Sequence, residues 1–240
     1  MVTKPVVLLG AALHTRDIEP GQDYDWYVKT GEMQLFEKMA DIYRIGLRDV
    51  GGEVPKVAVI IDCRRVGFLV GDLPSKREDH GHRLIYDTLY LEFDSQYQRS
   101  VLHAVAVLLL CHKNHYKHYE LHFTDYAEQL FYNLHAAPLL VFETVHLPIV
   151  DKQPDFSLTH LQADKLVLLS NQVNRNRCAR YLIHFTHQEE NSFSFVSTGR
   201  VSIKKCQQIA DKTDECLLLT LSSEVESEVN LKKGRLFGWW

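Results

Sequence analysis

The spacing of apolar residues predicts that strands and helices alternate along the first part of the chain. Val6–Leu13 is an apolar run typical of a buried first strand, because it is short for a secretion signal and lacks a good cleavage site. From Glu32 to Val50, large apolar residues recur at helical spacing and two glycines follow, which predicts an amphipathic helix with a glycine cap. The polar segment between these elements, residues 16–27, is predicted to be a loop.

The next three apolar segments have the character of strands. Val57–Ile61 and Val66–Val70 are rich in β-branched residues and flank a short polar turn, which predicts an antiparallel hairpin. Leu84–Phe93 alternates strictly, as a strand with two different faces does. One face carries Ile85, Asp87, Leu89, Leu91 and Phe93, and the other carries Leu84, Tyr86, Thr88, Tyr90 and Glu92.

Helical and strand patterns continue to alternate after this segment. A helix is predicted from residue 95 to about residue 118, followed by a short strand at 119–123, a helix at 125–135 and a strand at 138–147. A break in periodicity at Pro148–Ser157, which contains two prolines, is the predicted linker. The elements predicted beyond it are a helix at 158–173, a turn at 174–177, a hairpin over 180–197, a helix at 203–211, a strand at 216–221 and a polar tail.

These elements predict an α/β fold, with a mixed β-sheet that contains an antiparallel hairpin and is flanked by helices. Residues 1–150 are predicted to form an α/β domain. Residues 151–240 are predicted to form a smaller α+β subdomain with a polar C-terminal tail.

Composition narrows the class of protein. The 240 residues are 45% hydrophobic and 24% charged, which is ordinary for a folded, soluble chain. With a net charge of −4 there is no broad basic field, so non-specific binding to duplex DNA is not expected. The five cysteines are widely spaced and the apolar run at 104–111 is too short to span a bilayer. We therefore expect a cytoplasmic protein in a reducing compartment, with no membrane attachment.

Motifs of the common enzyme families are missing from the sequence. It has no P-loop, no G-x-G-x-x-G after a strand, no G-x-S-x-G elbow, no H-E-x-x-H and no zinc-deaminase signature. These absences favour a protein without catalytic activity, although a site assembled from distant residues would escape such a search. No cofactor is predicted, and a divalent metal is the open alternative.

A cluster of charged residues and histidines at 76–83 is the main candidate site. Arginine guanidinium groups bind phosphates and carboxylates, and aspartate and histidine serve as metal ligands or as acid and base. The alternative is a solvated connection between two strands. The candidates are Asp79 and His82 as catalytic residues, and Arg77, His80 and Arg83 as ligand-binding residues.

Two other clusters are weaker candidates. His112 and His115 stand three positions apart in a predicted helix and could hold a metal, although cationic side chains in a last helical turn are also favoured by the helix dipole. Residues 175–180, with three arginines, could form an anion-binding turn but read more simply as a solvated segment.

Aromatic residues mark candidate interfaces. Tyr86 and Tyr90 share one strand face, which could form a protein interface unless a helix covers it. Trp239 and Trp240 end the chain, and exposed tryptophans are costly without a partner.

The sequence thus favours a non-catalytic interaction or regulatory subunit of a cytosolic multiprotein assembly, with other protein subunits as partners. Two alternatives remain open. One is a metal-dependent hydrolase acting on a phosphodiester or nucleotide, and the other is a sensor that binds a small anionic ligand.

Overall fold

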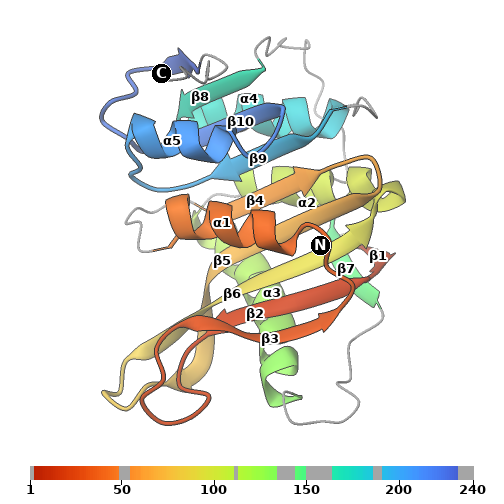
Figure 1. Ribbon diagram of the computed structural model, residues 1–240, viewed down its shortest axis with the longest axis vertical. Coiled ribbons are helices and arrows are strands. Elements are labelled where there is room, and N and C mark those ends of the chain that lie inside the picture. Colours follow the sequence, from red (N-terminus) through yellow and green to blue (C-terminus); the bar gives the residue numbers. More distant parts are fainter. Residues whose placement is uncertain are drawn as a thin grey trace, which may run out of the picture.

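A nine-stranded sheet forms the centre of the molecule (Figure 1). The structure, a computed structural model, describes residues 3–48, 55–110, 113–133, 144–149, 164–185 and 191–231. In spatial order the strands are β11 (Glu228–Asn230), β8 (Lys165–Leu169), β10 (Glu215–Thr220), β9 (Phe193–Ser197), β4 (Val57–Ile61), β5 (Arg65–Glu78), β6 (Leu84–Asp94), β2 (Gly10–Thr15) and β3 (Asp25–Gly31). A separate antiparallel pair is formed by β1 (Thr3–Val7) and β7 (Thr144–Pro148).

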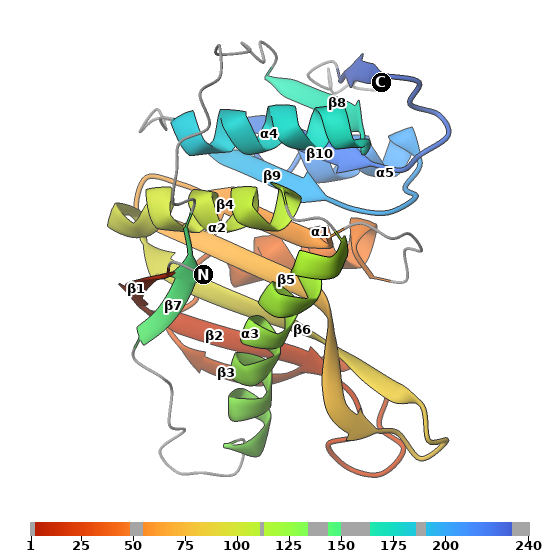
Figure 2. The same ribbon diagram turned by 180° about the vertical axis from the view of Figure 1, so that it is seen from behind.

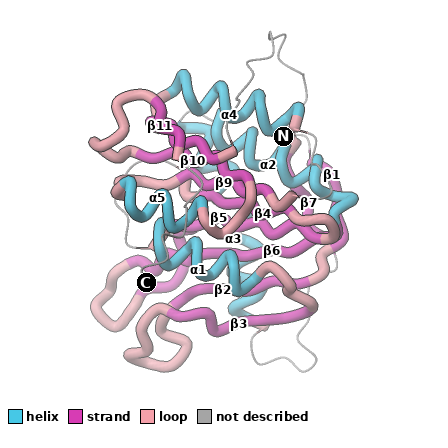
Figure 3. The backbone as a smooth tube through the Cα atoms, turned by 45° about the horizontal axis from the view of Figure 1, so that its top comes forward, coloured by secondary structure: helices cyan, strands magenta, loops and turns pink. Residues whose placement is uncertain are grey.

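Helices cover both faces of this sheet. Helices α1 (Phe36–Gly46) and α5 (Ile203–Ala210) pack on one face, next to each other (Figures 1 and 3). Helices α2 (Gln98–Leu110), α3 (Lys113–Tyr132) and α4 (Gln172–His184) pack on the other (Figure 2). Each face has its own apolar core, because successive side chains of a strand point to opposite faces.

The predicted α/β class with a mixed sheet is confirmed. Strands β4, β5, β6, β2 and β3 pair antiparallel, whereas β8, β10 and β9 pair parallel. The two kinds of pairing meet where β4 pairs antiparallel with β9. The sheet therefore runs without a break across the predicted domain boundary, and the division at residue 150 stays a prediction.

The hairpin of β5 and β6 is longer than its apolar runs predicted. The predicted strand at 66–70 extends to Glu78, and the pair projects beyond the body of the sheet together with the β2–β3 loop (Figure 1). The predicted alternation of Leu84–Phe93 is confirmed, since Leu89, Leu91 and Phe93 lie in the core on the α2 side and Tyr90 lies in the core on the α1 side.

Several local predictions in the N-terminal half were wrong. The single strand expected at 6–13 is two strands, β1 and β2, in different sheets. The loop expected at 16–27 ends early, because Asp25 begins edge strand β3. The strand expected at 119–123 is part of helix α3, since tertiary packing overrides the weak strand preference of five residues.

Further corrections concern the C-terminal half. Residues 165–169, expected to be helical, form β8, and the turn and first hairpin strand expected at 174–184 are helix α4. The tail expected to be loose contains strand β11 at 228–230. The helix at 203–211 and the strand at 216–221 are confirmed to within a residue.

Some of the predicted elements and candidate residues lie in parts of the chain that the structure does not describe. Residues 150–157 of the predicted linker, His112, Trp239 and Trp240 lie outside the described residues. No helix in the described ranges combines the length and apolar character that crossing a bilayer requires.

Candidate functional site

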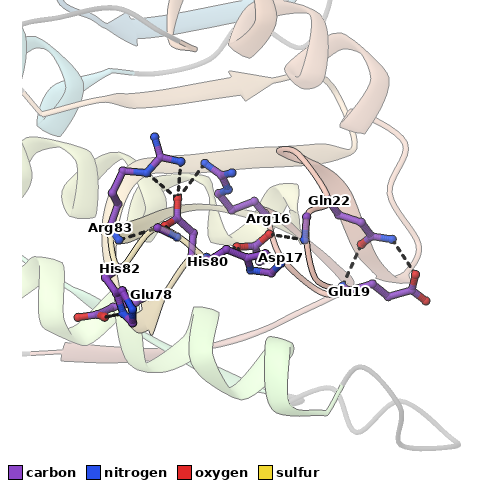
Figure 4. Close-up of polar contacts among 11 residues, drawn as sticks. Arg16, Asp17, Glu19, Gln22, Glu78, His80, His82 and Arg83 are labelled. Atoms are coloured by element: carbon purple, nitrogen blue, oxygen red, sulfur yellow. Dashed lines mark hydrogen bonds and ion pairs between the residues drawn. The ribbon is translucent and has the colours of Figure 1, made fainter.

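The charged cluster lies at the tip of the β5–β6 hairpin, where Figure 4 shows His80, His82 and Arg83. Asp79 organises the turn. The Asp79 carboxylate accepts hydrogen bonds from the backbone N–H groups of Gly81 and Arg83 at 2.8 and 3.0 Å. The Arg83 guanidinium binds it at 2.8 to 2.9 Å, and Arg16 from the β2–β3 loop approaches to 3.4 Å. The carboxylate is therefore surrounded by donors of its own chain, as in a structural turn.

These donors also set the acidity of Asp79. Led by the backbone N–H of Arg83, they stabilise the ionised form and hold the pKa of Asp79 at about 2. A general acid or base near neutral pH needs a pKa closer to 7. The geometry therefore favours Asp79 as a positioning group of the hairpin over a catalytic group.

A titration followed by carbon-13 NMR is expected to give the Asp79 carboxyl a midpoint near pH 2. The unfolded pKa of aspartate is about 3.9. Because the folded pKa is the lower one, the stability linked to this group is complete above about pH 4 and is lost as the pH falls towards 2. A midpoint near pH 4 would contradict the hydrogen-bonded turn.

The two histidines of the cluster pair with different carboxylates (Figure 4). His80 Nδ1 lies 3.6 Å from Asp17 of the β2–β3 loop, and His82 Nδ1 lies 3.4 Å from Glu78. Among the described residues, no three histidine, cysteine, aspartate or glutamate side chains are placed to hold a metal ion. The cluster ties two loops together, and its service as a metal or catalytic site stays a prediction without geometric support.

Arg77 does not lie with the rest of the cluster. Its side chain is on the α3 face of the sheet, where Nη2 donates to Asp87 at 2.7 Å and to Thr15 at 3.1 Å. The guanidinium also lies 3.5 Å from the ring centroid of Phe131 in α3. Arg77 and Arg83 do not face one common site, because the Arg77 side chain is half-buried and engaged with Asp87, so the prediction that they bind one anion has no geometric support.

Tyr90 is also corrected as an interface residue. Its ring is fully buried on the α1 face against Phe36, and its hydroxyl donates to Glu92. Tyr86, four residues earlier on the same strand face, is 48% exposed. One of the two predicted interface tyrosines is thus accessible.

The histidine and arginine segments lie elsewhere. His115 belongs to α3, and its side chain is outside the described residues. The arginines of 175–180 belong to α4, where Arg177 approaches Asn174 and Glu228. Helix α4 and the hairpin tip occupy opposite ends of the molecule, so the two charged segments do not form one site (Figure 2).

A pocket that sequence reasoning missed opens beside the C-terminal end of α1. It has a volume of about 290 Å³. It lies on the α1 face of the sheet, between the end of the helix and the base of the projecting hairpin. The lining residues are His14, Tyr24, Tyr43, Leu47, Arg48, Lys56, Asp72, Tyr86 and Thr88.

No family model, curated protein or solved structure matches this chain. The pocket therefore has to be interpreted from its own residues.

A β-bulge shapes the charged wall of this pocket. The pairing of β5 with β6 shifts between Val70 and Leu73, and Asp72 within the shift has a φ of +56°. This conformation is uncommon for a residue other than glycine, and such strain is concentrated at functional sites. It directs the Asp72 carboxylate to Lys56 Nζ, at 2.8 to 3.0 Å. A Cβ at Gly71 would lie 3.3 Å from the Lys56 side chain and 3.5 Å from that of Thr88, so glycine keeps this wall open.

Aromatic rings form the opposite wall. The rings of His14 and Tyr24 are stacked, with centroids 5.6 Å apart and an angle of 7° between the planes. The Tyr43 hydroxyl lies 3.2 Å from His14 Nδ1 and accepts from Thr88 Oγ1 at 3.4 Å. Burial raises the pKa of Tyr24, whose hydroxyl accepts from the backbone N–H of Tyr86. The pocket thus combines apolar ring surface with a few directed polar groups, as small-molecule sites do.

Proposed function

We propose that the protein binds a small anionic ligand in the pocket at the end of α1, without transforming it. The observation that carries this proposal is the placement of Lys56. Its side chain is almost fully buried and lines an open cavity, where its ammonium group is paired with Asp72, the half-exposed carboxylate of the same wall. A buried cation that borders a cavity favours an anionic occupant.

The charges of the lining residues support the same conclusion. Among the described lining residues, Lys56 and Arg48 are cationic, and Asp72 is the carboxylate and is paired with Lys56. Carboxylate and phosphate groups are the anions that lysine and arginine bind most often.

An interaction role fits together with ligand binding. Leu84 and Tyr86 are 56% and 48% exposed on the hairpin that projects beside the pocket (Figure 1). A partner subunit seated on this hairpin would contact the rim of the pocket. The proposed function is therefore that of a ligand-sensing subunit, which joins the interaction and sensor hypotheses.

The hydrolase hypothesis receives less support. It relied on Asp79, His80 and His82 as a metal-binding group. Asp79 is occupied by arginine and backbone donors, and the two histidines face separate carboxylates.

Replacing Lys56 with glutamine is expected to abolish stabilisation by small anions. Simple carboxylates and phosphates are screened by thermal unfolding. At least one of them should raise the melting temperature of the wild-type protein, because a ligand that binds only the folded state stabilises it. Lys204→Gln, which changes an exposed lysine of α5, is the matched control and should respond as the wild type does. Equal responses of all three proteins, or no response of the wild type to any anion, would contradict the proposed function.

A further inference from the structure

We infer that the ligand of this pocket is an aromatic anion, in which one carboxylate or phosphate group is carried on a flat ring. This inference rests on the proposed anion site and specifies the body of the ligand. It comes from three features of the pocket: the position of Tyr86, the depth of Lys56 and the volume of the cavity.

Tyr86 supplies a ring surface at the entrance of the pocket. It lines the cavity while almost half of its surface is exposed, and no contact with another ring is found for it within the described residues. Its backbone N–H donates to the hydroxyl of Tyr24, which holds the second aromatic wall close to it. A ring face left open at a pocket entrance is suited to stacking against a flat ligand.

The Lys56 side chain is more deeply buried than this ring. The side chain of Lys56 is 9% exposed, and the paired Asp72 carboxylate beside it is about half exposed. A ligand that enters acid group first would place its anion at Lys56 and leave its ring between the tyrosines. The exposed oxygen of Asp72 would then accept a hydrogen bond from any N–H or O–H group on the ring.

The volume limits the size of the ring system. A cavity of about 290 Å³ corresponds to roughly ten water molecules at ~30 Å³ each. This is at the lower end of the range for small-molecule pockets, which is about 300 to 1,000 Å³. One ring with an acidic substituent fits such a space, whereas a dinucleotide does not.

Benzoate is the probe for this inference, and two matched compounds separate its ring from its charge. Cyclohexanecarboxylate has the same acid group on a ring that is not flat, and benzamide has the flat ring without the charge. Titration calorimetry on the full chain should show that benzoate binds about fivefold more tightly than cyclohexanecarboxylate, and that benzamide binds more weakly than benzoate.

Two variants separate the contribution of the tyrosine ring to the binding of benzoate from that of the lysine charge. Tyr86→Leu keeps an apolar side chain and should bring benzoate and cyclohexanecarboxylate to nearly equal affinity. Lys56→Gln should weaken both acids at least tenfold and leave benzamide unchanged. Tyr132→Leu, at an exposed tyrosine of α3 away from the pocket, is the control and should bind as the wild type does.

The outcomes separate this inference from the proposed function. If the wild type binds benzoate and cyclohexanecarboxylate equally well, the inference of an aromatic ligand is overturned. If Lys56→Gln then loses binding of both acids, the proposed anion site still stands. Binding of benzamide as tight as that of benzoate would also overturn the inference. If neither acid binds, or if Lys56→Gln binds both unchanged, the anion site itself is refuted.

Discussion

Glu92→Ala is expected to lower the free energy of unfolding by about 3 to 5 kcal/mol. The Glu92 side chain is fully buried beneath the first turn of α1. It accepts hydrogen bonds from the backbone N–H groups of Gln34 and Leu35 at 2.7 and 3.0 Å, and from the hydroxyl of Tyr90. Alanine would remove the acceptor of all three donors, of which those of Leu35 and Tyr90 are buried, and each buried donor left without an acceptor costs about 1 to 3 kcal/mol before relaxation.

The first turn of α1 depends on this side chain. Leu35, at the N-cap position, makes no capping hydrogen bond with its own side chain, so a carboxylate from β6 supplies the acceptor that a local cap would provide. The negative charge also interacts favourably with the positive end of the helix dipole. Glu92 is therefore a helix cap provided by a strand.

Urea unfolding measures this effect directly. Glu37→Ala is the matched control, because Glu37 is an exposed acidic residue in the same turn and should change stability by less than about 0.5 kcal/mol. The loss of stability in Glu92→Gln should lie between those of Glu92→Ala and Glu37→Ala. The amide oxygen of glutamine still accepts a hydrogen bond, but its NH₂ group is a donor and faces backbone donors. A Glu92→Ala variant as stable as the control would show that α1 is not capped in this way.

Arg77→Met is expected to cost about 3 to 5 kcal/mol, because it leaves Asp87 as an unpaired carboxylate in the core. Asp87 is almost completely buried, and Arg77 is its charged partner. Methionine keeps the apolar stem of the side chain but lacks the guanidinium that lies over Phe131, so the loss includes this contact as well as the missing charge. Arg44→Met, which breaks an exposed ion pair with Asp41, should cost less than about 1 kcal/mol.

The pair predicts non-additive behaviour and a defined pH dependence. Arg77→Met combined with Asp87→Leu should recover most of the lost stability, because no buried charge then remains. Burial raises the pKa of Asp87, and the nearby charge of Arg77 partly offsets this rise. The pKa of Asp87 should therefore be still higher in Arg77→Met. The folded state then binds the proton more tightly than the unfolded state, and the single variant should lose stability as the pH rises above about 4. A pH-independent cost, or a double variant as unstable as the single one, would contradict this account.

Strict alternation was the most informative pattern in the sequence. It separated Leu89, Leu91 and Phe93, which lie in the core on the α2 side, from Tyr90, which lies in the core on the α1 side, because successive side chains of a strand point to opposite faces. Short segments were less predictable. Residues 165–169 and 119–123 contain mixtures of apolar and polar residues that suit a helix or a strand, and packing of distant elements decided between them.

The candidate site depended even more on distant contacts. The charged cluster was visible because its residues are adjacent in sequence, but adjacency did not reveal that Asp79 is held by Arg16 or that Arg77 points to the opposite face. The pocket is assembled from residues of six separate segments between His14 and Thr88. Its one local signal was the Gly71–Asp72 pair, which directly follows the strand predicted at 66–70 and lies at the bulge of the longer strand β5.

The pairing of β4 with β9 has a consequence for synthesis of the chain. Val57–Ile61 is buried along its whole length, and one of its two edges is covered by Phe193–Ser197, far later in the sequence. During translation the N-terminal half emerges with this apolar edge unpaired, and an exposed edge of this kind recruits other strands. The nascent chain is therefore at risk of aggregation until β9 has left the ribosome. A chain truncated before residue 193 should be insoluble unless chaperones bind it.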